Sequence, residues 1–281
     1  MLEDVVALLR CPHCAGDLSL ADRTARCAAG HSFDVARQGY LNLLPGDAQP
    51  GTADTAAMVD ARHRFLSTGH YAPIADAVAV AAQAAVLHAA DPRPAILDVG
   101  AGTGHHLATT LDRIPTARGL ALDISKHALR RAARAHPRLA AIGADAWRPL
   151  PLKSSAATAI LTVFSPRNPA EIHRILQPSG ALVLATPTPT HLQEVIAALG
   201  LLKVDPQKQQ RLDDRLAELD IAAETTVEHR LTLTHDDLAA LTAMGPSSHH
   251  VDPATVNQRI ADLPQPFPAT ASVRVATYRP S

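Results

Sequence analysis

The sequence is poor in cysteine, in aromatic residues and in long apolar runs. Only three of its 281 residues are cysteines, and all three lie within the first 27 positions. The odd cysteine count argues against a disulfide framework, and the acidic N-terminal stretch does not resemble a signal peptide, so we expect a soluble, cytoplasmic protein. The most apolar stretch, residues 77–90, is too short to cross a bilayer, so no membrane partner is expected.

The scarcity of aromatic residues and of net charge is also informative. Aromatic residues make up 3% of the chain and hydrophobic residues 47%, which indicates a core of Ala, Leu, Val and Ile. With a net charge of −1, any polyanion would need a local basic patch. Residues 112–138 offer one, because Lys126, Arg130 and Arg134 share one helical face there. Such a stripe is more often a solvated helix face than an RNA contact.

The N-terminal cysteines have the spacing of a structural zinc site. The pattern C-x2-C-x12-C-x3-H is formed by Cys11, Cys14, Cys27 and His31. Three thiolates and one imidazole complete a tetrahedral shell and leave no open position for catalysis. Zinc binding can stabilise a domain whose core is too small to fold alone. We therefore expect a zinc-binding domain over residues 1–45, a linker over 46–57 and a larger domain over 58–281.

Residues 94–104 have the pattern of a buried strand that runs into a glycine-rich turn. Asp98 precedes the three alternating glycines Gly100, Gly102 and Gly104. A glycine-rich turn can also mark a dinucleotide-binding fold, but there the third glycine comes three residues after the second. The alternating pattern resembles motif I of class I S-adenosylmethionine-dependent methyltransferases, where the backbone approaches the cofactor closely.

Two more acidic residues follow the next two apolar stretches. Asp123 ends the stretch 118–123, where it can accept hydrogen bonds from ribose hydroxyls, and Asp145 follows the stretch 139–144, where it can meet an adenine amine. One such acid alone is a weak signal, because a carboxylate at a strand end is commonly a helix cap. Together with Asp98 they predict an S-adenosylmethionine site.

The rest of the chain alternates strands and helices. The expected strands are 157–164, 180–186, 221–234 and 271–278, and the expected helices are 168–176, a helix after Thr234, and 253–261. This order predicts an α/β fold of the class I S-adenosylmethionine-dependent methyltransferase type, which is Rossmann-like. We expect a mostly parallel seven-stranded sheet, helices on both faces, and a ligand cleft at the carboxyl ends of the strands.

With these motifs in view, the chain resembles the guanine-N1 methyltransferases of 23S ribosomal RNA, most closely the tylosin-resistance type of actinomycetes. The resemblance covers nearly the whole length and is carried by the zinc ligands and by the segments 31–44, 58–73, 98–106, 164–168, 186–191 and 244–250. It implies that the zinc domain recognises RNA and that the protein is a homodimer. It also implies methylation of nucleotide 748 in hairpin 35, with macrolide resistance as a consequence.

The resemblance implies cofactor roles for individual residues. The cofactor contacts of the family match Tyr71, Gly102, Thr103 and His191. On the general fold argument they are joined by Asp98, Gly100, Gly104, Asp123 and Asp145.

The target pocket has its own candidates. Phe164 and Pro166 are expected to shape it, while His249 stands where close relatives have a tryptophan, and Ser165 replaces an alanine. If the tryptophan stacks on the extruded base, an imidazole offers a smaller face. Water, Asp60 and His249 remain open as acceptors of the guanine N1 proton.

Two other functions remain open at this stage. The chain could methylate a small molecule such as an antibiotic, with the zinc domain as an interaction module. It could also be a non-catalytic ribosome-binding protein that has kept the fold.

Overall fold

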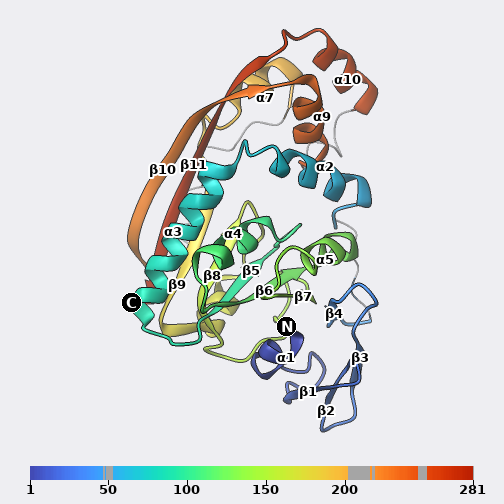
Figure 1. Ribbon diagram of the computed structural model, residues 1–281, viewed down its shortest axis with the longest axis vertical. Helices are drawn as coiled ribbons and strands as arrows, with labels where there is room; N and C mark the ends of the chain where they lie inside the picture. The colour runs from blue at the N-terminus through green and yellow to red at the C-terminus, as the bar shows by residue number, and fades with distance from the viewer. Residues whose placement is uncertain (47, 49–52, 202–215, 217–218, 246–251, 281) are drawn as a thin grey trace.

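The computed structural model describes residues 1–46, 48, 53–201, 216, 219–245 and 252–280, and its elements surround one large twisted sheet (Figure 1). The sheet has eight strands in the order β10-β11-β9-β8-β5-β6-β7-β4. In chain order these are β4 (Leu41–Asn42), β5 (Ala95–Val99), β6 (Arg118–Asp123), β7 (Leu139–Gly143), β8 (Ala157–Val163), β9 (Leu176–Pro187), β10 (Leu219–Leu233) and β11 (Phe267–Pro280).

The strand directions agree with the sequence prediction of a mostly parallel sheet. Pairing is parallel from β4 through β7, β6, β5 and β8 to β9, while β11 runs antiparallel to both of its neighbours, β9 and β10. All seven expected strands form, although several are longer than expected; the one expected over 180–186 begins at Leu176. The carboxyl ends of β5, β6, β7 and β8 therefore meet at one edge, where ligands bind in open α/β sheets.

Helices cover one face of the sheet. Successive strand residues point to opposite faces, so in β5 Ile96 packs toward these helices and Leu97 toward the other side. The helices whose buried residues share this core are α2 (Ala56–Ser67), α3 (Ala72–Ala89), α4 (His105–Arg113), α5 (Lys126–Ala132), α7 (Gln193–Leu199), α9 (His235–Ala243) and α10 (Pro253–Ala261).

The N-terminal segment covers much of the opposite face, together with α6 (Pro169–Ile175). This segment contains α1 (Leu2–Val5), η1 (Val6–Leu8) and the small sheet of β1 (Leu18–Ala21), β2 (Thr24–Cys27) and β3 (Ser32–Asp34). Leu9 and Cys27 belong to the same core as Leu97, and the Lys153 backbone N–H donates to Leu8 O at 2.9 Å. Helices therefore lie on both faces, as predicted, but on this face the zinc-binding segment packs beside α6 and takes part of the area where further helices were expected.

Strand β4 is the eighth strand, which the sequence pattern did not indicate. Leu41 pairs with Ile142 and Asn42 with Gly143 in parallel register. The seven predicted strands belong to residues 58–281, and the eighth extends their sheet from the N-terminal segment.

Helix α3 is long and apolar enough to cross a membrane by length and composition. The sequence predicts that residues 77–90 are too short to cross a bilayer, but the whole helix meets the criteria of length and composition. Its buried residues include Ile74, Val78, Ala82 and Val86, which recur every four positions on one face. That face packs against β8, β9 and α4, which is the arrangement of a core helix.

The contact between β4 and β7 leaves no room for a side chain at Gly143. A Cβ there would lie 3.3 Å from Asn42 Cα and still closer to the Asn42 amide oxygen. We expect Gly143→Ala to lower the free energy of unfolding by about 1–3 kcal/mol, because one strand must move to admit the methyl group. Urea unfolding measures this change. Asn42→Ala in the Gly143→Ala background should recover part of the loss, and an unchanged midpoint in the single variant would contradict the pairing.

Candidate functional site

The four predicted zinc ligands converge at one point in the N-terminal segment. Their ligand atoms, from Cys11, Cys14, Cys27 and His31, all lie within 4.8 Å of one another. The Sγ atoms of Cys14 and Cys27 are 3.6 Å apart, and Cys27 Sγ lies 3.3 Å from His31 Nδ1. Donors at this spacing suit a tetrahedral Zn²⁺ bound at about 2.0–2.3 Å from each. The three thiols are free in the structure.

The thiols of this cluster interact electrostatically. Burial works to raise the pKa of Cys27, but hydrogen bonds from His31, Cys14 and Ala29 outweigh it and lower the pKa to about 6. A backbone hydrogen bond from Gly16 acts to lower the pKa of Cys14, but burial and the adjacent Cys11 and Cys27 raise it overall. Crowded thiols that compete for one negative charge are suited to a cation, which allows all of them to ionise.

Removal of one ligand tests both the metal site and its connection to the sheet. We expect Cys27→Ser to lose the zinc that the wild-type chain carries, as measured by atomic absorption. Because Cys27 shares a core with Leu97, the thermal midpoint of the whole chain should fall as well. Full zinc content in the variant would contradict the ligand assignment. If the variant instead showed a separate unfolding transition at lower temperature and an unchanged main transition, the shared core would be contradicted.

The glycine-rich turn after β5 adopts a backbone that only glycine adopts readily. Gly100, Gly102 and Gly104 have φ angles of 71°, 56° and 79°. A Cβ on Gly100 would lie 2.7 Å from Ser165 Cβ, and one on Gly104 would lie 3.2 Å from Ala132 Cα. The glycines therefore let the loop after β8 and the helix α5 approach the turn closely.

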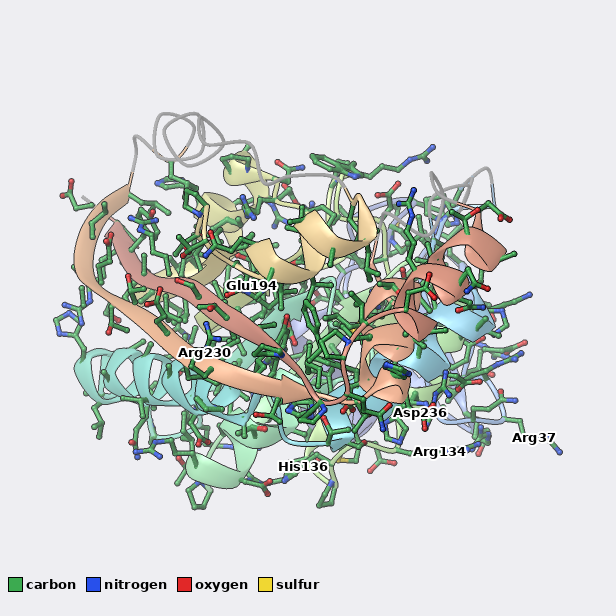
Figure 2. The ribbon with its side chains drawn as sticks, turned by 90° about the horizontal axis from the view of Figure 1, so that it is seen from above. Arg37, Arg134, His136, Glu194, Arg230 and Asp236 are labelled. Carbon is green, nitrogen blue, oxygen red and sulfur yellow. The ribbon has the colours of Figure 1, made fainter. Side chains whose placement is uncertain are left out.

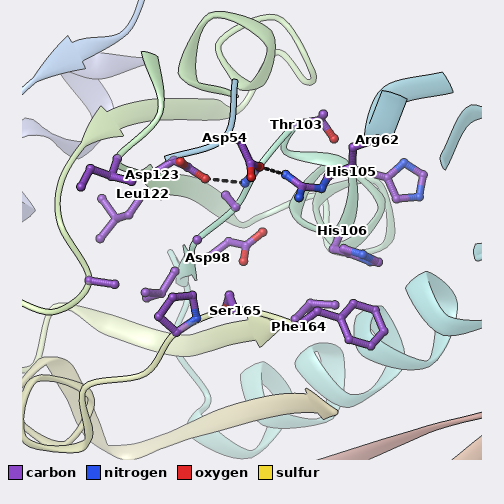
Figure 3. Close-up of a pocket in the computed structure, with 18 of the residues that line it drawn as sticks. Asp54, Arg62, Asp98, Thr103, His105, His106, Leu122, Asp123, Phe164 and Ser165 are labelled. Carbon is purple, nitrogen blue, oxygen red and sulfur yellow. Dashed lines mark hydrogen bonds and ion pairs between the residues drawn. The ribbon is translucent and has the colours of Figure 1, made fainter. Parts of the chain in front are cut away.

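The three predicted acids line one cavity of about 270 Å³ at this edge of the sheet. Figure 3 shows two of them, Asp98 and Asp123. Asp98 is 2% exposed. Asp123 accepts hydrogen bonds at 2.8 Å from the Gly102 and Ser125 backbone N–H groups, one on each oxygen. Asp145 accepts from the Trp147 N–H at 2.9 Å. Each carboxylate keeps acceptor capacity for a ligand, because each oxygen has two lone pairs.

The cavity favours a ligand that carries positive charge and hydrogen-bonding groups. Burial, together with the nearby Asp123, raises the pKa of Asp98 to about 7. Burial also raises the pKa of Asp123, although the hydrogen bonds from its two backbone donors act to lower it. The buried atoms Ser165 Oγ and His106 Nδ1 have no hydrogen-bond partner within the described residues, and both side chains line the cavity. S-adenosylmethionine, with its sulfonium, ammonium, ribose and adenine groups, fits this set of partners.

An aromatic cluster forms another part of the wall. Tyr71 Oη and His191 Nε2 are 3.1 Å apart. His191 Nδ1 accepts from the Ser272 N–H at 3.1 Å, so Nε2 carries the proton and donates to Tyr71. The Phe164 ring stacks on His191 with a centroid distance of 5.8 Å. Burial and the nearby His229 lower the pKa of His191 to about 4, so it is neutral at pH 7.

Two of these three aromatic residues line the cavity. They are Tyr71 and Phe164, whereas His191 lies behind them and is not among the lining residues. Its direct contact with the cofactor therefore stays a prediction. Pro166 and Ser165 line the cavity, but His249 and most of its loop lie outside the described residues.

Several lining residues were not identified from the sequence. Asp54, within the predicted linker, forms an ion pair with Arg62 of α2, and Arg62 Nη2 donates to Met244 O at 3.0 Å (Figure 3). Ser125 Oγ donates to Asp54 O at 2.7 Å, which fixes this segment over the cavity. Trp147, 65% exposed, lines the same cavity. Linker-like composition hid Asp54, and for Trp147 its position next to Asp145 was the available signal.

Asp60 occupies a different place from the cofactor residues. Its carboxylate is 63% exposed and pairs with Arg131 at 2.7 Å. It lines a neighbouring cavity and is not among the residues that line the cofactor cavity.

Two family models match the two parts of this architecture. The N-terminal zinc ribbon described as "RlmA, N-terminal" matches residues 9–49, and a methyltransferase domain matches residues 96–180. Among solved structures, the YjhP protein of E. coli has a TM-score of 0.48 at 15% identity, over 80% of this chain and 99% of that chain. Fold and site define an S-adenosylmethionine-dependent methyltransferase with a zinc ribbon.

Full-length relatives define the family. A Streptomyces fradiae protein named 23S rRNA (guanine(748)-N(1))-methyltransferase is 48% identical, with 100% of this chain and 99% of the relative covered. A Micromonospora griseorubida protein, whose name gives 23S rRNA (guanine-N(1)-)-methyltransferase as its activity class, is 49% identical over the full length of both. The chain belongs to the 23S rRNA guanine-N1 methyltransferase family.

The raised pKa of Asp98 gives a prediction with a definite pH dependence. The folded protein binds a proton at Asp98 up to about pH 7, whereas the unfolded chain releases it near its ordinary value of 3.8. The stability due to this group is therefore greatest below pH 4 and is lost as the pH rises to 7. Asp98→Asn removes the buried charge, so we expect the ligand-free variant to be more stable than wild type at pH 8, by roughly 4 kcal/mol for a pKa raised from 3.8 to about 7.

The same substitution should weaken S-adenosylmethionine binding, because an amide cannot neutralise a cationic ligand. Thermal melts at pH 5 and pH 8, with calorimetric titration of the cofactor, measure both effects. A stability difference that is equal at the two pH values would contradict the buried-carboxyl account.

Proposed function

We propose that this chain methylates N1 of a guanine in 23S ribosomal RNA with S-adenosylmethionine as the donor, and that the target is nucleotide 748 in hairpin 35. The observation that carries the proposal is the cavity lined by Asp98, Asp123 and Asp145 around the glycine turn, present in a chain that aligns from end to end with the S. fradiae relative. That relative is named for guanine 748, which supports the choice of nucleotide.

The chain's own residues would hold and orient the cofactor. Asp123 would accept from the ribose hydroxyls, Asp145 from the adenine amine, and Asp98 would offset positive charge near the glycine turn. When bound, S-adenosylmethionine supplies a methyl group on a sulfonium, which a nitrogen lone pair can attack directly. Tyr71 forms the buried wall of the cavity and excludes water, since it is 3% exposed and hydrogen-bonded to His191.

The target guanine would enter beside the loop that follows β8. Phe164 is 41% exposed at the cavity wall, and its φ of 53° is uncommon for an aromatic residue. An exposed ring there offers a stacking surface for a base taken out of a hairpin, and Pro166 limits its depth of entry. Correct orientation of the two reactants can lower the activation free energy by roughly 7–11 kcal/mol.

The N1 proton has to leave during the reaction. Of the three acceptors considered from the sequence, Asp60 faces the neighbouring cavity and pairs with Arg131, which favours water or His249. Burial lowers the pKa of His106 to about 3, and His191 is similarly neutral, so neither histidine is basic enough to hold the proton near neutral pH.

Membership of the same family supports a proposal for the biological setting. We place the enzyme on the large ribosomal subunit in the cytoplasm, as a homodimer in which the zinc ribbons help to bind the RNA. Methylation at the macrolide site of the exit tunnel would then reduce the binding of tylosin and related drugs.

Methyl transfer to RNA tests the proposed function directly. Purified protein with tritiated S-adenosylmethionine should label protein-free 23S RNA or assembled large subunits, and primer extension should stop at guanine 748. Transfer to a small molecule alone, or a stop at another nucleotide, would contradict the proposal.

Phe164→Ala tests the predicted stacking surface. Loss of base–aromatic stacking worth about 1–3 kcal/mol should reduce kcat/KM for RNA about 5- to 150-fold, while the affinity for S-adenosylmethionine measured by calorimetry changes less. Phe164→Tyr keeps the aromatic face and serves as the control. A loss of cofactor affinity as large as the loss of kcat/KM would assign Phe164 to the cofactor rather than to the base.

A further inference from the structure

A second cavity, of about 520 Å³, adjoins the cofactor cavity and shares Thr103 and His105 with it. It is lined by residues of α2, α4 and α5 and of the turn after α5, and six of its thirteen lining residues are Arg or His. Among the described residues that line it, Asp60 is the one acid, and this carboxylate is already paired with Arg131. Its basic side chains are His63, His105, His127, Arg130, Arg131 and Arg134.

Two of these charges are not neutralised within the protein. Arg130 and Arg134 are both exposed, and within the described part of the chain neither guanidinium has an ion pair or hydrogen bond. Two nearby histidines have lowered pKa values, chiefly because they are partly buried. Burial lowers the pKa of His63, and the positive charge of Arg131 lowers it further, while Asp60 has a smaller opposing effect. Burial also lowers the pKa of His105, to which His63 adds a smaller contribution.

The basic surface continues toward the zinc ribbon. A third cavity, of about 430 Å³, shares His127 with the second and is lined by Lys126 together with Tyr40 and Asn42 of the N-terminal segment. Asp54, the acid among its described lining residues, is paired with Arg62. A Cβ on Gly39 would lie 3.9 Å from Ala133 Cβ, so the turn before Tyr40 lies against the end of α5.

Arg37 extends the surface on that turn. It is exposed and has no ionic partner among the described residues. Figure 2 shows Arg37 and Arg134 on the same side of the molecule. We name the surface of Arg37, Lys126, Arg130 and Arg134, with the two cavities between them, the α5 groove.

From this geometry we propose that the α5 groove binds the sugar–phosphate backbone of the RNA substrate, between the zinc ribbon and the cofactor cavity. This inference rests on the proposed function. A groove that extends over two connected cavities, with separated positive charges, suits a chain of phosphates better than one phosphate. The chain as a whole has a net charge of −1, so the surface is not basic in general. The unpaired arginines at this groove are therefore a local concentration of positive charge.

The concave setting distinguishes the groove from an ordinary solvated helix face. On a solvated face, basic side chains extend freely into water and are commonly balanced by acids one helical turn away. Here Arg130 and Arg134 face residues of α2 across a cavity, and Asp60, the acid that α2 contributes, binds Arg131 instead. Phosphate oxygens in the cavity would supply the missing counter-charge.

The test is the double variant Arg130→Gln/Arg134→Gln in the full-length chain with zinc. Its affinity for a fluorescent hairpin-35 RNA is measured by anisotropy at salt concentrations between about 0.05 and 0.3 M. Loss of two phosphate contacts should weaken binding about 15- to 30-fold at 0.15 M salt and reduce the slope of log K against log salt by about 1.4–1.8. Cofactor affinity and the thermal midpoint should stay at wild-type values.

Arg64→Gln is the matched control, because Arg64 is an exposed arginine on α2 that lines none of the three cavities. An unchanged RNA affinity in the double variant would overturn the inference. It would also be overturned if the control lost as much RNA affinity for each charge removed, because the effect would then come from the overall charge of the protein. Inorganic tripolyphosphate is the competing probe. Tighter binding of tripolyphosphate than of the hairpin, abolished in the double variant, would assign the groove to a small polyphosphate and overturn the RNA assignment.

Failure of the proposed function would look different. In that case the wild-type chain itself would neither bind nor methylate the hairpin, whatever the state of the groove. A wild-type enzyme that methylates RNA, together with a double variant that binds RNA normally, would reject the groove alone.

Discussion

The structure of the site depends on one constraint, the absence of side chains in the turn from Gly100 to Gly104. The Gly102 N–H donates to Asp123, which joins the ends of β5 and β6. Gly100 allows the loop after β8 to approach to a distance that a Cβ would prohibit, and Gly104 does the same for α5. The cofactor cavity is the space that remains between these segments, so its shape follows from the backbone of the turn.

The zinc ribbon is connected to this site through the sheet. Its core continues into the core under β5 and β6, and β4 pairs with β7 next to the strand that carries Asp123. A small metal-stabilised domain therefore replaces part of the helical layer that usually covers the second face of such a sheet. This packing fixes the position of the ribbon, with its exposed turn at Arg37, relative to the groove along α5 and the cofactor cavity.

Much of the fold and part of the site were predictable from the sequence, for identifiable physical reasons. The buried strands β5 to β8 are continuous apolar runs that end in an acid or a turn, and the zinc ligands have a spacing that few other structures require. Asp98, Asp123 and Asp145 could be placed because the carboxyl ends of parallel strands meet at one edge.

The features that sequence analysis missed all depend on contacts between distant segments. Strand β4 has only two residues and forms through tertiary packing, so the sequence has no local periodicity that could predict it. Asp54 looked like part of a linker because its neighbours have linker composition, yet its ion pair with Arg62 holds it at the cavity. The predicted basic stripe is only partly helical, because Lys126 and Arg130 lie on α5 whereas Arg134 lies in the turn after the helix ends at Ala132. The cavity that Arg130 and Arg134 line is completed by residues of α2 and α4, which no local pattern could indicate.

A crystal structure of the chain with S-adenosylhomocysteine tests the central claim most directly. The account predicts the ribose hydroxyls on Asp123, the adenine beside Asp145, and the amino acid end near Asp98 and Tyr71. The glycine turn should keep its present backbone. A ligand bound elsewhere, or a cavity that stays empty at saturating ligand, would contradict the account.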